Sequence, residues 1–169
     1  MGSSADFSPD ALRLQIERHA QGQSVHVLQC GDWSTVQAGA RAVRTAVFIE
    51  EQAIAEADEW DSDDAAAIHA VVTNLAGLPL ATGRLITQGM PNNEAKIGRM
   101  AVLRSSRGVG LGRQVLQALL AEARAKGLAK VTLHAQTSAQ AFYQRAGFTP
   151  EGPVFDEVGI PHIVMQLTL

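Results

Sequence analysis

An arginine and three glycines form the most distinctive chemical pattern in this sequence, in the segment Arg107-Gly108-Val109-Gly110-Leu111-Gly112. Glycine has no Cβ, so its main chain can approach a ligand closely. An amphipathic helix is predicted to follow, and the N-terminus of a helix presents unpaired N–H groups with a partial positive charge. The segment therefore predicts a phosphate-binding loop, with a ligand-free glycine-rich turn as the alternative.

The loop differs from two other phosphate-binding patterns. No Lys-Ser/Thr pair follows the glycines, as it would in a Walker A loop. The glycine spacing also departs from the G-x-G-x-x-G of dinucleotide-binding folds. The histidines show no metal-ligand spacing such as H-E-x-x-H, so no metal site is predicted.

Composition indicates an ordinary globular protein. The 169 residues are 46% hydrophobic and 18% charged, and the net charge is −3. No overall basic field would attract nucleic acid or a membrane surface. No apolar run is long enough to span a bilayer, and the N-terminus lacks the features of a secretory signal. The single cysteine, Cys30, is expected to pack as a small hydrophobe, and we expect a cytoplasmic protein.

The elements that must position the loop follow from periodicity and turn signals. We expect an extension with a short helix over 1–22, capped by Ser8, and a single domain over 23–169. Expected strands cover 25–28, 68–74, 80–87, 95–103, 131–135, 153–158 and 161–169. Expected helices start at capping boxes, Ser34 to Gln37 and Thr137 to Gln140, or follow the loop over 111–126. The crossover helix implies a parallel strand pair, so the fold class is α/β with a mixed sheet.

An acidic stretch over 56–64 allows two interpretations. Runs of charge are usually solvated, so a solvent-exposed loop is the first expectation. The alternative is a rim that attracts a cationic amine.

Two motifs in the expected order resemble one enzyme family. Arg107-x-x-Gly110-x-Gly112 follows a strand, and Phe142-Tyr143-x-x-x-Gly147-Phe148 follows a later helix start. Over roughly residues 24–169 the chain resembles the GNAT (GCN5-related N-acetyltransferase) superfamily. Arg44-x-x-Val47-Phe48-x-x-Glu51-Gln52 and the segment 159–165 look like its ElaA-type group. The resemblance implies a central six- to seven-stranded mixed sheet flanked by helices.

The resemblance also implies an acetyl-CoA site. Backbone groups of Met100, Ala101 and Val102 would line the pantetheine arm. Main-chain amides of the loop would hold the pyrophosphate, with contacts from the Arg107 and Arg113 side chains. The loop amides belong to Arg107, Gly108, Val109, Gly110, Leu111 and Gly112. Tyr143 would lie near the thioester sulfur and protonate the departing thiolate.

The implied reaction is direct attack of an amine on the acetyl carbonyl, which needs the amine to lose its proton first. Glu51 is the base candidate that we place in the site. Arg44 lies seven residues before it, so a structural ion pair between the two is the alternative. Other candidate bases are His69, His134, Asp156, Glu157 and His162, and an ordered water could serve instead.

Other functions stay open at this point. Arg44, Trp60 and the acidic run also resemble acyl-homoserine-lactone synthases, which use S-adenosylmethionine. A catalytically silent acyl-CoA-binding GNAT domain is the non-enzymatic alternative. The sequence does not name the acceptor amine or whether longer acyl groups are used. An exposed closing strand makes a homodimer possible.

Overall fold

The computed structural model describes residues 25–91 and 93–169, and all structural statements concern these residues. The expected helix within 1–22 lies outside them. The elements run in this order: β1 (Val27–Gly31), α2 (Trp33–Arg44), η1 (Thr45–Glu51), α3 (Glu56–Glu59), η2 (Ser62–Ala65), β2 (Ile68–Thr73), β3 (Pro79–Ile86), β4 (Glu94–Val102), η3 (Arg104–Ser106), α4 (Leu111–Ala125), β5 (Lys130–Gln136), η4 (Thr137–Ala139), α5 (Gln140–Arg145), β6 (Thr149–Glu157) and β7 (Ile160–Thr168).

One mixed sheet organises the fold, with strand order β1-β2-β3-β4-β5-β7-β6. Within it β4 and β5 are parallel and are joined by α4, while the neighbouring pairs are antiparallel. The expected mixed sheet and its parallel pair are therefore confirmed. A strand that returns to the same sheet in parallel needs such a crossover.

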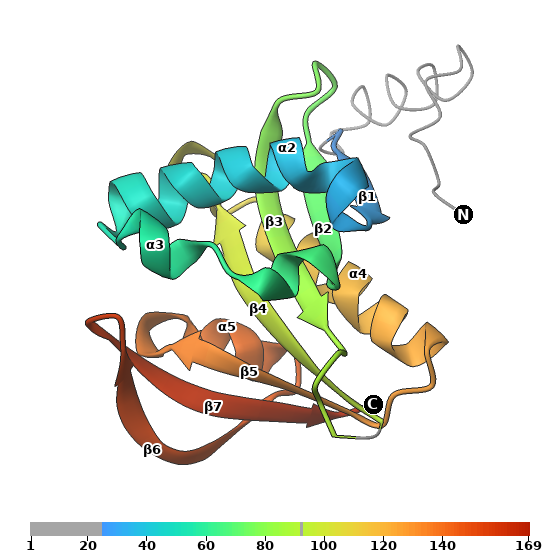
Figure 1. Cartoon of the computed structure of the whole chain (residues 1–169), viewed down its shortest axis with the longest axis vertical. Coiled ribbons are helices and arrows are strands. Elements are labelled where there is room, and N and C mark those ends of the chain that lie inside the picture. The colour runs from blue at the N-terminus through green and yellow to red at the C-terminus, as the bar shows by residue number, and fades with distance from the viewer. Residues whose placement is uncertain (1–24, 92) are drawn as a thin grey trace.

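Helices cover both faces of the sheet (Figure 1). The apolar side of α2 packs Val36 and Ala40 against Val71 of β2. The apolar side of α4 buries Val115 and Leu119 with the residues of β2 that point the other way, because side chains alternate along a strand. The β4–β5 junction therefore lies inside the sheet, which has helices on both faces.

Both predicted capping boxes are wrong in detail. The α2 helix starts two residues earlier than expected, and Asp32 caps it by accepting a hydrogen bond from the Thr35 N–H at 2.9 Å. Asp32 also accepts from the hydroxyls of Ser34 and Thr35, so its carboxylate outcompetes them as the cap. The α5 helix follows a short 3₁₀ turn, and its first residues have no side-chain cap.

The closing hairpin places β6 at the edge of the sheet, as the strand order requires. Pairing between β6 and β7 shifts register between Glu151 and Phe155. Pro153 lies in that interval, and a bulge with proline is a common means of protecting an edge strand. The homodimer stays a prediction.

Candidate functional site

The sheet opens where β4 and β5 separate. Their pairing runs from Glu94 opposite Lys130 to Ile97 opposite Leu133. Both strands continue beyond it, β4 to Val102 and β5 to Gln136. Within the part of the chain described, the main chain of β4 from Gly98 onward therefore has no strand partner on its β5 side, and the expected pantetheine-binding residues Met100, Ala101 and Val102 lie there.

A bulge in β4 lies at the same point. Thr82 of β3 faces Ala101, whereas Arg84 faces Gly98, so β4 carries one more residue than β3 in this interval. Arg99 has φ 51°, a left-handed conformation that is uncommon outside glycine. The bulge turns the Arg99 side chain into the opening between the strands.

The glycine-rich loop follows β4 and leads directly into α4. Gly108 and Gly110 have φ values of 84° and 88°, and Gly110 is the residue that precedes the helix. No atom lies within 4 Å of a Cβ built on either glycine. The loop therefore requires glycine there for its backbone conformation, and it leaves open space at the helix N-terminus.

The side chain of Arg107 is engaged within the protein. Its Nε donates to the Val102 carbonyl at 3.0 Å, and its two terminal nitrogens each lie 2.8 Å from an oxygen of Glu51. The bidentate pair with Glu51 holds the loop against η1, and the hydrogen bond to Val102 holds it against the end of β4. The expected phosphate contact of the Arg107 side chain stays a prediction, and it would compete with this pairing, whereas Arg113 is exposed on the first turn of α4.

Glu51 lies outside the opening and pairs with Arg107 rather than Arg44. The hydrogen bond from Arg107 holds the pKa of Glu51 below its usual value. The predicted Arg44–Glu51 pairing is wrong because the helix changes to a π-helical turn over Thr45–Glu51. A π turn has a wider i→i+5 pattern, so residues seven apart no longer share a face.

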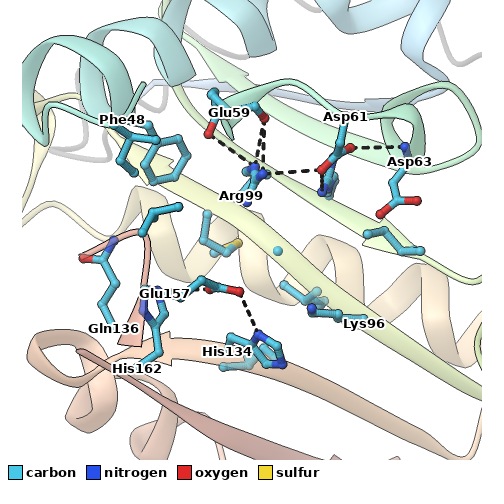
Figure 2. Close-up of a pocket in the computed structure, with 18 of the residues that line it drawn as sticks. Phe48, Glu59, Asp61, Asp63, Lys96, Arg99, His134, Gln136, Glu157 and His162 are labelled. Atoms are coloured by element: carbon cyan, nitrogen blue, oxygen red, sulfur yellow. Dashed lines mark hydrogen bonds and ion pairs between the residues drawn. The ribbon is translucent and has the colours of Figure 1, made fainter. Parts of the chain in front are cut away.

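A cleft of about 400 Å³ lies at the separation of the strands (Figure 2). Its lining comes from η1, the acidic stretch, β3, β4, β5, α5 and the closing hairpin. The ionisable side chains that line it are Asp58, Glu59, Asp61, Asp63, Arg84, Lys96, Arg99, His134, Tyr143, Glu157 and His162. The sequence analysis did not identify Arg84, Lys96 and Arg99, although charged residues inside otherwise apolar strands were a visible signal.

The acidic stretch forms one wall of the cleft, and the expectation of a wholly solvated loop is wrong. Glu59 and Asp64 are buried, with 2% and 4% of their surface exposed. Arg44, itself 1% exposed, donates to Glu59 at 2.5 Å and to Asp64 at 2.7 Å. Arg84 donates to Asp64 at 2.7 Å. Buried charges are tolerated when they are paired in this way.

Burial and hydrogen bonding act in opposite directions on the carboxylates of this wall, and burial prevails at Glu59, whose pKa it raises. Burial on its own raises the pKa of Asp64, but hydrogen bonds from Arg44 and Arg84 outweigh it and hold that pKa below its usual value. Arg99 reaches the wall from β4 and lies 3.3 Å from Glu59 and 3.4 Å from Asp61 (Figure 2). The arginines therefore pair with Glu59, Asp61 and Asp64, which are three of the six carboxylates in the acidic stretch.

The opposite side of the cleft gathers three of the candidate bases. His134, Glu157 and His162 come from β5, β6 and β7, and Glu157 lies between the two histidines (Figure 2). The other candidates lie elsewhere. His69 is buried against Trp33 and bonds to the Asp64 carbonyl, and Asp156 accepts from the Gly159 N–H in the hairpin turn.

Tyr143 lies in the cleft wall with 7% of its surface exposed. It packs edge-on against Phe142 and Phe148, with ring centroids 5.0 and 5.9 Å away. Burial raises its pKa well above the usual value, so the phenol keeps its proton. A Cβ on Gly112 would lie 3.5 Å from Phe142, so α5 packs against the start of α4 and also contributes Tyr143 to the cleft.

Among the described residues, no cluster of histidine, cysteine and acidic side chains fits a metal ion. No helix among them is both long and apolar enough to cross a bilayer. Cys30 is half-buried at the edge of the core, and burial raises the pKa of its thiol.

The chain matches an acetyltransferase family model and several solved acyltransferase structures. The model of the acetyltransferase (GNAT) domain matches residues 38–169. YyaT of Bacillus subtilis (strain 168) is 38% identical over 126 residues, which are 73% of this chain and 82% of that protein. An acyl-CoA N-acyltransferase from Pseudomonas aeruginosa has a TM-score of 0.74 at 30% identity, covering 83% of this chain and 98% of that one.

Two more solved structures bear on the expected resemblances. Escherichia coli ElaA has a TM-score of 0.74 at 28% identity, covering 83% of this chain and 98% of its own. A CoA-dependent acyl-homoserine lactone synthase, BjaI, has a TM-score of 0.69 at 18% identity, covering 85% of this chain and 83% of its own, and shares the fold. With a family model spanning most of its length, this chain belongs to the GNAT acetyltransferase family.

Proposed function

We propose that this acetyltransferase uses acetyl-CoA as its donor and transfers the acetyl group to an amine. The observation that carries the proposal is the end of β4–β5 pairing after Ile97 and Leu133, just before the glycine-rich loop. It leaves a strand edge that can bond to the amide groups of a pantetheine arm. The main chain of Met100, Ala101 and Val102 would supply those groups.

The loop would hold the pyrophosphate through its backbone. The first N–H groups of α4 have no partner within the helix, and the partial positive charge there favours an anion. Gly108 and Gly110 set the loop conformation, and Arg113 supplies an exposed cation on the first turn. In this proposal the engaged Arg107 side chain shapes the loop, while its amide joins those of residues 108–112 in contacting phosphate.

Tyr143 would act as the general acid. Attack of a neutral amine forms the C–N bond, and cleavage of the C–S bond releases a thiolate that needs a proton. A buried phenol with a raised pKa is protonated at neutral pH and can donate that proton. Glu51, held by Arg107 outside the cleft, would position the loop rather than take a proton from the acceptor.

The acceptor would bind in the charged cleft. The carboxylates of Asp58 and Asp63 line it. Among the four acidic residues of the stretch that line the cleft, these are the two for which the described residues supply no side-chain hydrogen bond or ion pair. They favour a cationic acceptor over an anionic one. The acceptor would enter from the side of this wall and present its nitrogen near Tyr143.

Calorimetric titration with acetyl-CoA tests the donor, and S-adenosylmethionine is the parallel ligand. The expected result is micromolar binding of acetyl-CoA and none of S-adenosylmethionine. Binding of S-adenosylmethionine instead would favour an acyl-homoserine-lactone-synthase-like reaction. Binding of acetyl-CoA without turnover on a broad amine panel would favour a silent acyl-CoA-binding domain.

A further inference from the structure

A carboxylate lies between two imidazoles at one side of the cleft. Glu157 Oε1 is 3.2 Å from His134 Nδ1, and Glu157 Oε2 is 3.5 Å from His162 Nε2. Glu157 and His162 lie on the two strands of the closing hairpin, and His134, 23 residues before Glu157, joins them because β5 pairs with β7. Figure 2 shows both rings directed toward Glu157.

Hydrogen-bond roles fix the tautomer of His134. An ionised carboxylate only accepts, so Nδ1 of His134 must donate to Glu157. A neutral His134 then carries its lone pair on Nε2. The Nδ1 of His162 lies 2.7 Å from the Ile160 carbonyl oxygen, which also only accepts, so this nitrogen carries a proton. The Nε2 of a neutral His162 then directs its lone pair toward Glu157. When His162 is neutral, His134 is the imidazole that donates to Glu157, and when His162 is protonated, its Nε2 also faces Glu157 as a donor at 3.5 Å.

His134 is both held and accessible. Its ring packs edge-on against Phe155, with centroids 5.1 Å apart. Its side chain is 32% exposed, whereas that of His162 is 8% exposed. His134 also lines the same cleft as Tyr143. An imidazole oriented by a carboxylate, with its second nitrogen free, is the arrangement that general-base catalysis uses.

We propose that His134 is the general base of acetyl transfer and that Glu157 is the residue that positions it, an inference that rests on the proposed function. Nε2 of His134 takes a proton from the acceptor ammonium, and the resulting amine attacks the acetyl carbonyl. The C–N bond forms, the C–S bond breaks, and Tyr143 protonates the thiolate. The phenolate takes the second proton from the amide nitrogen, and His134 releases its own proton to water.

Other charges face this group and set its titration together with Glu157 and His162. Lys96 of β4 lies on the same side of the cleft, and its charge helps to keep Glu157 ionised. Burial on its own raises the pKa of Glu157, but the hydrogen bond from His134 and the nearby positive charges bring it below its usual value. Across the cleft lie Arg84, Arg99 and the carboxylates of Asp58, Glu59, Asp61 and Asp63.

The pH dependence of kcat/KM for the acceptor tests the proposal. Wild-type activity should fall at low pH as His134 becomes protonated, because an imidazolium cannot accept a proton. His134→Gln should lower kcat about 100-fold and remove this acid limb while acetyl-CoA affinity stays unchanged. Glu157→Gln removes a charge that favours the imidazolium, so the limb should move to lower pH.

Asp156→Asn is the matched control, because it neutralises the neighbouring carboxylate, which serves the hairpin turn. It should leave the limb in place. Normal turnover and an unchanged profile in His134→Gln would overturn the assignment of the base alone. A wild-type protein that transfers no acetyl group to any amine would overturn the proposed function and the base with it.

An NMR titration tests the same geometry without turnover. In the wild type, ¹⁵N shifts of His134 should show the tautomer protonated at Nδ1, and its titration midpoint should fall in Glu157→Gln. A tautomer protonated at Nε2, or a midpoint that Glu157→Gln leaves unmoved, would overturn the proposal.

Discussion

The glycine-rich loop and the charged cleft recognise ligands by opposite means. The loop presents main-chain groups and open space, with its arginine side chain turned away toward Glu51. The cleft presents ionisable side chains, many of them already paired with each other. A loop of backbone amides suits a donor whose phosphate groups are always the same. A cleft of side chains suits proton transfer and the choice of acceptor, which differ from enzyme to enzyme.

The largest expected effect concerns Tyr143, which lies where the two regions meet. Tyr143→Phe keeps the ring packing and removes the proposed acid, so kcat should fall by about 10²- to 10⁴-fold. Calorimetry should find acetyl-CoA affinity nearly intact, since the loop is untouched. Unchanged turnover would remove Tyr143 from the chemistry.

Arg44 tests whether the wall of the cleft is a structural core. Arg44→Met leaves Glu59 and Asp64 buried with one fewer cation, and loss of one partner of a buried pair costs about 3–5 kcal/mol in the free energy of unfolding. Urea denaturation measures the change. Arg41→Met is the control, because Arg41 also packs over Trp60, at 4.5 Å, but is exposed. Equal losses in the two variants would contradict the role of the ion pairs.

Gly110 tests the loop without touching the cleft. A β-branched residue at φ 88° is strained by about 1–3 kcal/mol, so in Gly110→Val the loop should leave this conformation. Acetyl-CoA affinity should then fall about 5- to 150-fold by calorimetry. Gly112→Ala is the control, since its Cβ would make ordinary contacts at 3.5 Å. Normal binding by Gly110→Val would mean that the loop does not hold the pyrophosphate.

The smallest expected effect comes from Glu51, which distinguishes a positioning role from a catalytic one. Glu51→Gln removes the charge of a pair at the surface, and such pairs contribute about 0.2–1 kcal/mol. We therefore expect less than a fivefold change in acetyl-CoA KM and no change in the pH profile. Glu50→Gln, at an exposed neighbouring position, is the control. A loss of about 100-fold in kcat would restore Glu51 as the base.

The sequence predicted the elements that depend on near neighbours. The α4 helix over Leu111–Ala125 and the parallel pair β4–β5 match their expected positions closely, because apolar periodicity and glycine punctuation are local signals. The loop was identified for the same reason, since its residues are contiguous. The cap of α2 was missed by two residues because Asp32, Ser34 and Thr35 lie within four residues of one another and all can cap a helix.

The order of the elements, the glycine-rich loop, the Phe-Tyr motif and the family were thus determined by the sequence alone. Only the tertiary structure decided the partners of the charges. In it Arg107 pairs with Glu51, Arg44 pairs with Glu59 and Asp64, and Glu157 pairs with His134. The π-helical turn directs Glu51 away from Arg44, and the pairing of distant strands brings His134 to Glu157, and neither feature has a local signal in the sequence. A carboxylate binds whichever cation the fold brings within hydrogen-bonding distance, and that distance is set by the packing of the whole chain.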